Sequence, residues 1–170
     1  RKSGSCVLRI VKESILDVDA DIIVMSANPS LLAGSGVSGV IHKAAGPELE
    51  QYAKSFAPLA EGQAILTPAF NLKANYVVHT VCPRFYDGHR GEQQGLQDAY
   101  LNALAVCNEL DRSSTIAFVA MGTGVYKWPI EDAADIAIGV VSRSKFKQTL
   151  VCIQDNRIIS AFTQAMVSRL

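Results

Sequence analysis

Short apolar runs alternate with helix-like segments along the whole chain of 170 residues, and this alternation restricts the fold more than any other feature. Several runs are rich in Val and Ile and apolar at nearly every position, which is typical of strands covered on both faces. The sequence therefore predicts a three-layer αβα domain of the α/β class, with a mixed, largely parallel central sheet of about six strands. We expect strands at Cys6–Val11, Asp21–Met25, Gln63–Leu66, Tyr76–Val81, Thr115–Val119 and Thr149–Ile153, and helices at Val40–Ala45, Pro47–Phe56, Glu92–Glu109, Pro129–Val141 and Ile158–Leu170.

Composition and charge indicate one globular domain. Hydrophobic residues make up 49% of the chain, and 16 Lys and Arg balance 16 Asp and Glu. Formal neutrality argues against binding to nucleic acid, and the apolar runs are too short to span a membrane. We expect a monomer. Because the chain opens without an initiator Met, we expect residues 1–5 to be a cut edge or a cloning remnant and residues 6–170 to form a domain of a longer protein.

The cysteines favour a reducing compartment. Their spacing matches no zinc pattern, and most of them fall in or beside predicted strands and helices, where a thiol acts as a small buried hydrophobe. The four are Cys6, Cys82, Cys107 and Cys152. We expect the cytoplasm, or the nucleus if the source is a eukaryote, and no metal or cofactor.

Two glycine-rich segments, each placed after a predicted strand, are the main candidates for a binding site. They are Gly34-Ser35-Gly36-Val37-Ser38-Gly39 and Gly122-Thr123-Gly124-Val125-Tyr126. Glycines allow backbone N–H groups to turn toward an anion, and a helix that starts behind them adds a positive dipole end. Ligands of open α/β sheets bind beyond the carboxyl ends of the strands. We therefore expect both segments, together with residues 82–85 and 154–156, to converge on one crevice for a phosphate-containing ligand.

Other interpretations of the first segment are weaker. Gly34, Gly36 and Gly39 satisfy the G-x-G-x-x-G pattern of dinucleotide-binding folds. In those folds, however, the glycines follow the strand directly and a strand-end acid comes about 20 residues later, where this chain has Pro58 and Leu59. A P-loop is excluded because no Gly-Lys-Ser/Thr follows. A glycine-rich turn that only reverses the chain remains an alternative.

The wider sequence resembles the macro domain family. The matching stretches occur in order over nearly the whole chain: residues 21–49 with Asn28 and Ala44-Ala45-Gly46, residues 72–83 with Tyr76-Val77-Val78-His79-Thr80, Ile116-Ala117-Phe118, and Gly122-Thr123-Gly124-Val125-Tyr126. Macro domains bind ADP-ribose, free or attached to protein, and some hydrolyse the bond to the protein. The resemblance implies that the two glycine loops clasp the diphosphate of ADP-ribose through backbone amides.

The resemblance also implies roles for particular residues. The first loop would contribute Gly34, Ser35, Gly36 and Val37, and the second Gly122, Thr123, Gly124, Val125 and Tyr126. Ser35 suits this role if its φ is negative. Ser26 and Ala27 would line the site, and Asn28 would bind the distal ribose, although a turn residue before Pro29 is its alternative. Ser14, Ile15, Gln154 and Asn156 would lie near the adenine. Asn28 and Ser38 are the catalytic candidates.

Several positions depart from the family pattern. Ser14 stands where an Asp usually accepts from the adenine amino group, Met25 where the motif has Asn, and polar Gln154 where an aromatic ring would stack. Ser38 replaces the Asp of hydrolytic members, and a hydroxyl cannot act as a general base near pH 7. These departures favour binding of ADP-ribose or ADP-ribosylated protein. The alternatives are a mono-ADP-ribosyl-protein hydrolase or O-acetyl-ADP-ribose deacetylase with an atypical site, and a degenerate domain for another nucleotide-like ligand such as poly(A).

Aromatic side chains near these motifs are expected to have packing roles. His42 follows the first loop on a helix, and His79 lies within a strand. Trp128 is expected at the rim or in the core. Phe85 and Tyr86 could lie beside the ligand or cover the edge of the core equally well.

Overall fold

The computed structural model describes residues 6–124 and 126–169, and within them every predicted strand and helix is present. The elements are β1 (Val7–Val11), β2 (Ile22–Ser26), α1 (Gly36–Ala45), α2 (Pro47–Ala53), a 3₁₀ turn η1 (Lys54–Phe56), β3 (Ala64–Pro68), β4 (Tyr76–Thr80), α3 (Glu92–Ala105), β5 (Thr115–Val119), α4 (Ile130–Val141), β6 (Gln148–Cys152) and α5 (Asn156–Val167).

The boundaries differ most at the first glycine segment and at the end of α3. Helix α1 begins at Gly36, four residues before the predicted start, so the glycine loop runs directly into the helix. Helix α3 ends at Ala105 rather than near Glu109. Beyond it the backbone forms tight turns, in which the Cys107 and Asn108 N–H groups donate to carbonyls three residues before them. Leu170, the predicted end of the last helix, lies outside the described residues.

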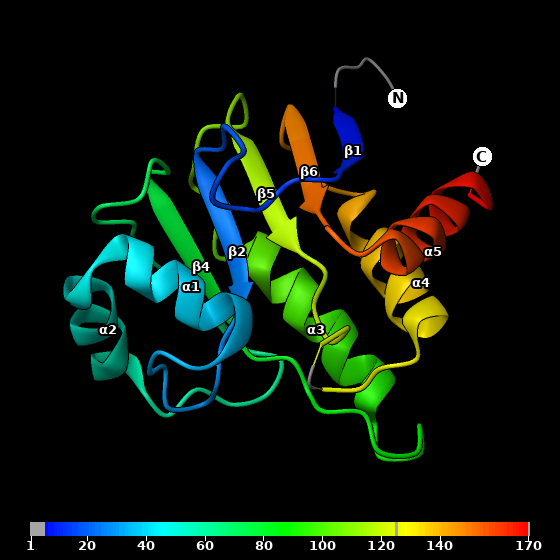
Figure 1. Cartoon of the computed structure of the whole chain (residues 1–170), viewed down its shortest axis with the longest axis horizontal. Helices are drawn as coiled ribbons and strands as arrows, with labels where there is room; N and C mark the ends of the chain where they lie inside the picture. The colour runs from blue at the N-terminus through cyan, green and yellow to red at the C-terminus, as the bar shows by residue number, and fades with distance from the viewer. Residues whose placement is uncertain (1–5, 125, 170) are drawn as a thin grey trace.

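The strands form one mixed sheet in the order β1-β6-β5-β2-β4-β3. All neighbours are parallel except β3 and β4, which pair antiparallel from Ala64 opposite Thr80 to Pro68 opposite Tyr76. Strands β2 and β5 are therefore adjacent, parallel and central. Their carboxyl ends open at the same edge of the sheet, and Figure 1 shows the chain leaving both at that end.

Helices cover both faces of the sheet, as the predicted three-layer fold requires. Helix α3 covers one face, where Thr80 Oγ1 donates to the Ala99 carbonyl at 2.9 Å and the Tyr100 and Phe118 ring centroids are 5.8 Å apart. Helix α1 covers the other face, where the His42 and His79 ring centroids are 6.1 Å apart. Helix α4 packs between α3 and α5 (Figure 1).

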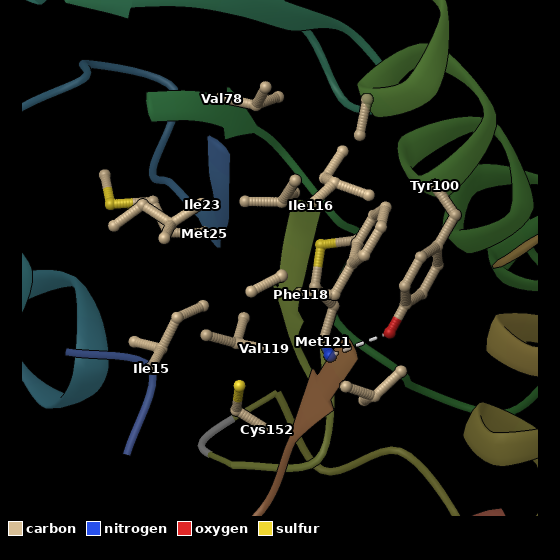
Figure 2. Packing of buried hydrophobic residues seen from close by; sticks show 14 of the residues in the cluster. Ile15, Ile23, Met25, Val78, Tyr100, Ile116, Phe118, Val119, Met121 and Cys152 are labelled. Atoms are coloured by element: carbon tan, nitrogen blue, oxygen red, sulfur yellow. Dashed lines mark hydrogen bonds between the residues drawn. The ribbon is translucent and has the colours of Figure 1, made fainter. Parts of the chain in front are cut away.

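The apolar core extends to the segment that follows β5. Phe118 and Met121 are fully buried beside Tyr100, and the Met121 N–H donates to the Tyr100 hydroxyl oxygen at 2.9 Å (Figure 2). This bond satisfies a backbone donor that would otherwise be buried without a partner. The second glycine segment, which starts at the next residue, therefore begins from a rigid support.

Candidate functional site

A pocket of about 440 Å³ lies beyond the carboxyl ends of β2 and β5. Such a volume falls within the usual range for small-molecule sites. Residues of both glycine segments line it. The lining residues are Ser26, Ala27, Asn28, Gly34, Ser35, Gly36, Val37, Ser38, Val119, Ala120, Met121, Gly122, Thr123, Gly124 and Tyr126.

The first side of the pocket is the N-terminus of α1. Ser35 precedes the helix in an extended conformation, with φ −86° and ψ 175°. Its φ is negative, so a serine fits at this position without backbone strain. Within the described part of the chain, no side chain caps α1 and no acid lies in its first turn. Helix α5 differs, because the Asp155 carboxylate accepts from the Arg157 N–H at 2.8 Å. The uncapped α1 leaves its first N–H groups and dipole end for an anion.

The loop before α1 turns back over the first turn of the helix at Gly39. A Cβ at this position would overlap the backbone oxygen of Gly34. The absence of a side chain at Gly39 thus lets residues 34–36 lie against the helix. This close approach places the Gly34 segment and the start of α1 on the same wall of the pocket.

The second side of the pocket is a compact turn built around Gly122, whose φ of +86° favours glycine. The Thr123 Oγ1 donates to the Ala120 carbonyl at 2.8 Å, and the Trp128 N–H donates to the Gly122 carbonyl at 3.1 Å. Tyr126 lines the pocket, and burial raises the pKa of its phenol. Val125, predicted to contact the diphosphate, lies outside the described residues.

Asn28 lies at the pocket wall, but its carboxamide bonds to its own loop. The Nδ2 group donates to the Leu32 carbonyl at 2.9 Å. The Oδ1 atom accepts from the Ser30 hydroxyl at 2.6 Å and from the Leu32 N–H at 3.2 Å. Asn28 therefore acts as a turn residue that shapes the first side of the pocket. Its contact with a distal ribose stays a prediction.

Ser38 places an unsatisfied hydroxyl in the site. Its Oγ is buried, lines the pocket and has no hydrogen-bond partner among the described residues. One helical turn further, His42 is 5% exposed, and burial lowers the pKa of its imidazole. His79 is fully buried, with its Nε2 at 3.0 Å from Thr67 Oγ1, and burial lowers its pKa to about 3. Both histidines are thus packed and neutral at pH 7, and both ring nitrogens of His42 and the Nδ1 of His79 lack hydrogen-bond partners among the described residues.

The predicted adenine contacts do not line this pocket. Ser14 Oγ accepts from the Leu16 N–H at 3.2 Å, and Ile15 is buried in the core. Gln154 is exposed, and Asn156 is the exposed first residue of α5. Their contact with adenine stays a prediction, as does convergence of the 154–156 segment on the crevice.

Three residues of the pocket wall were not predicted from the sequence. Val119, Ala120 and Met121 form part of the wall, and their position at the end of β5 was the available signal. Trp128 is in the core, and Phe85 packs on it with ring centroids 5.1 Å apart. Phe85 therefore covers the core edge, whereas Tyr86 is largely exposed.

Cys82 lies beside Ser26 of the pocket wall but does not itself line the pocket, and neither do residues 83–85, so their convergence on the crevice stays a prediction. Cys82 is buried, its Sγ lies 3.2 Å from Ser26 Oγ, and burial raises its pKa to about 11, so the thiol is a packed and protonated group. Residues 6–124 and 126–169 hold no cluster of three or more His, Cys, Asp or Glu side chains placed to bind a metal ion. None of the helices in this part of the chain is long and apolar enough to cross a membrane.

These features, two glycine loops facing each other across the carboxyl edge of a mixed six-stranded sheet, define an α/β domain with a pocket suited to an anionic ligand. The chain belongs to the macro domain family, whose model matches residues 24–137. A macro domain-containing protein of Chlorobaculum tepidum is 34% identical over 166 residues, which cover 95% of this chain and 96% of the relative. The O-acetyl-ADP-ribose deacetylase of Klebsiella pneumoniae is 42% identical over 137 residues, which cover 78% of each protein.

Solved structures share the whole fold. The Oceanobacillus iheyensis macrodomain with ADP superimposes with a TM-score of 0.90 at 29% identity and covers 100% of this chain and 96% of that one. The Trypanosoma brucei macrodomain in complex with ADP-ribose has a TM-score of 0.83 at 26% identity and covers 94% of this chain and 68% of that one. The predicted fold and family are thus confirmed.

Proposed function

We propose that this domain binds ADP-ribose, free or attached to protein, with the diphosphate held between the two glycine loops. The observation that carries the proposal is the uncapped N-terminus of α1, which faces the Gly122 turn across one pocket. Backbone N–H groups and a helix dipole are suited to a diphosphate and need no charged side chain. Related proteins with ADP, with ADP-ribose, or named for an ADP-ribose ester support the same ligand class.

Isothermal calorimetry with ADP-ribose, ADP and AMP tests this proposal. A clamp for the diphosphate predicts that ADP-ribose and ADP bind at least tenfold more tightly than AMP, a difference of about 1.4 kcal/mol. Equal affinities for ADP-ribose and AMP would overturn it. Asn28→Ala should weaken the binding of ADP-ribose more than that of ADP if Asn28 turns to the distal ribose. Equal losses of affinity for the two ligands would assign Asn28 a role in loop shape only.

Hydrolysis is the second candidate function, favoured by the name of the Klebsiella pneumoniae relative and by the unsatisfied Ser38 hydroxyl inside the pocket. Ser38 can orient a water molecule or a ligand oxygen by hydrogen bonding, but a neutral hydroxyl supplies no general base. We therefore propose slow cleavage of O-acetyl-ADP-ribose or of mono-ADP-ribosylated protein. Incubation with each substrate tests this, and release of no product by a protein that binds ADP-ribose would leave a binding module.

We further propose that the domain acts as a monomer in a reducing compartment and does not take extended nucleic acid as its ligand. Cys82, Cys107 and Cys152 are buried thiols without disulfides, and the formal charge is balanced. Size-exclusion chromatography with light scattering tests the monomer, since a dimer mass would refute it. Binding of an oligoadenylate with the same affinity as ADP-ribose would refute the proposal that extended nucleic acid is not a ligand.

A further inference from the structure

We propose that Glu92 is a positioning residue for the ligand site: its carboxylate holds the 83–91 loop in shape, and this loop presses Trp128 against the second glycine turn. The inference rests on the proposed binding of ADP-ribose. Glu92 is not part of the pocket wall, and its effect on the ligand would pass through Trp128.

The Glu92 carboxylate is a buried anion surrounded by backbone donors. Glu92 is the first residue of α3 and is only 3% exposed. Its Oε2 accepts from the N–H groups of Tyr86, Asp87 and Gly88 at 2.9, 3.0 and 3.1 Å, and its Oε1 accepts from the Arg90 N–H at 2.7 Å. A buried charge is costly unless it is fully hydrogen-bonded, so this carboxylate and this loop conformation require each other.

The charge persists at neutral pH. Burial alone would raise the pKa of the Glu92 carboxyl, but the four backbone donors outweigh burial and hold the pKa at about 2. The position at the first turn of α3 also places the anion at the positive end of a helix. A neutral side chain of the same size would accept fewer of these N–H groups, which leaves backbone donors without partners.

The 83–91 loop connects Glu92 to the indole of Trp128. Within the loop, the Pro83 carbonyl accepts from Trp128 Nε1 at 2.8 Å, and Phe85 packs on the indole with ring centroids 5.1 Å apart. The Phe85 N–H also donates to the Tyr126 carbonyl at 3.0 Å. The loop therefore bonds to both ends of the short segment that closes the second glycine turn.

Trp128 in turn sets the position of Gly122. A Cβ at Gly122 would lie 2.5 Å from Cδ1 of the indole, so the ring fills the space that a side chain would take. The Trp128 N–H donates to the Gly122 carbonyl at 3.1 Å. A shift of the indole would therefore move the Gly122 turn, and errors of about 1 Å in a binding loop are costly.

The test uses Glu92→Gln, Trp128→Phe and the double variant, with Asp111→Asn as the matched control. Asp111 accepts the Ser113 N–H at 2.9 Å in the turn before β5, at the opposite end of that strand from the pocket. Trp128 is the single tryptophan of the chain, so acrylamide quenching of intrinsic fluorescence reports its packing directly. Calorimetry with ADP-ribose and with adenosine, which has no phosphate, separates the diphosphate contribution.

We expect Glu92→Gln to weaken ADP-ribose about tenfold, to leave adenosine affinity unchanged and to increase quenching of Trp128, with no change from Asp111→Asn. Because both residues act on one turn, the double variant should lose no more than the worse single variant. Additive losses, or wild-type affinity and quenching in a folded Glu92→Gln, would overturn the proposal.

A second variant keeps the test informative if Glu92→Gln does not fold. Phe85→Leu removes the ring contact with Trp128 and leaves the Glu92 bonds in place, so it should weaken ADP-ribose and increase quenching. Unchanged values would overturn the proposal. Failure of the wild-type protein to bind ADP-ribose would instead refute the proposed function, and the quenching comparison would still decide whether Glu92 positions Trp128.

Discussion

Replacement of Gly39 by alanine separates the requirements of the fold from those of the ligand. Gly39 lies inside α1, where alanine is favoured over glycine by about 1 kcal/mol. The new Cβ would overlap the Gly34 backbone oxygen. A carbon and an oxygen that are not bonded normally stay at least about 3.3 Å apart. Forced overlaps of this kind cost about 1–3 kcal/mol. The net loss of unfolding free energy in Gly39→Ala is therefore typically about 0–2 kcal/mol.

Ligand affinity should fall more than folding stability, because relief of the overlap moves the Gly34 loop away from the start of α1. A displacement of about 1 Å in a binding loop can cost up to a hundredfold. We expect Gly39→Ala to weaken ADP-ribose by about 10- to 100-fold in calorimetry, with urea unfolding as the measure of stability.

Gly139→Ala in α4 is the matched control for this prediction. Its Cβ would meet only the end of the flexible Arg169 side chain, far along the chain from the pocket residues. It should raise the free energy of unfolding by up to about 1 kcal/mol and leave ADP-ribose affinity unchanged. If Gly39→Ala behaved as Gly139→Ala does in both assays, the close approach of Gly34 to Gly39 would have no role in binding.

Three further predictions concern catalysis, pH and stability. Ser38→Asp should raise hydrolysis of a mono-ADP-ribosylated substrate by about 10²-fold or more, since it supplies a carboxylate base, and a rate equal to wild type would contradict this. Because the folded-state pKa of His79 is lowered from 6.5 to about 3, the unfolded chain binds more protons between these values. Stability should therefore fall as the pH drops below about 6.5, by up to about 1.4 kcal/mol per pH unit, in urea titrations, and His79→Gln should flatten this slope. Tyr100→Phe should cost about 1–3 kcal/mol in urea unfolding because the buried Met121 N–H loses its acceptor, and an unchanged midpoint would refute that role.

Much of the fold was predictable because its signals are local. Continuous apolar runs predicted the strands to within one or two residues at most ends. The start of α1 was placed four residues late, since glycine and serine at positions 36–39 read as loop rather than helix. The helix starts at Gly36 despite their low helix propensity, and Gly39 lies close to Gly34, an approach that no propensity describes.

Parts of the site were harder to predict because a motif does not state which groups a side chain contacts. The resemblance predicts that Asn28 contacts a ribose, which stays a prediction, and the structure shows its carboxamide in three bonds within its own loop. Ser14 and Gln154, assigned from the resemblance alone, do not line the pocket beside the glycine loops. A motif gives the type of residue at a position, whereas the hydrogen-bond partner depends on the surrounding backbone.

The sequence by itself determined the alternation of strands and helices, the two glycine loops at strand ends and the family, since each is written in residues close along the chain. Only the tertiary structure decided that Glu92, 36 residues before Trp128, holds the 83–91 loop in shape, that Trp128 fills the space beside Gly122, and that Tyr100 supports Met121. Those contacts join segments far apart in the chain. Their geometry follows from the packing of α3 against β5, and packing has no local signature in sequence.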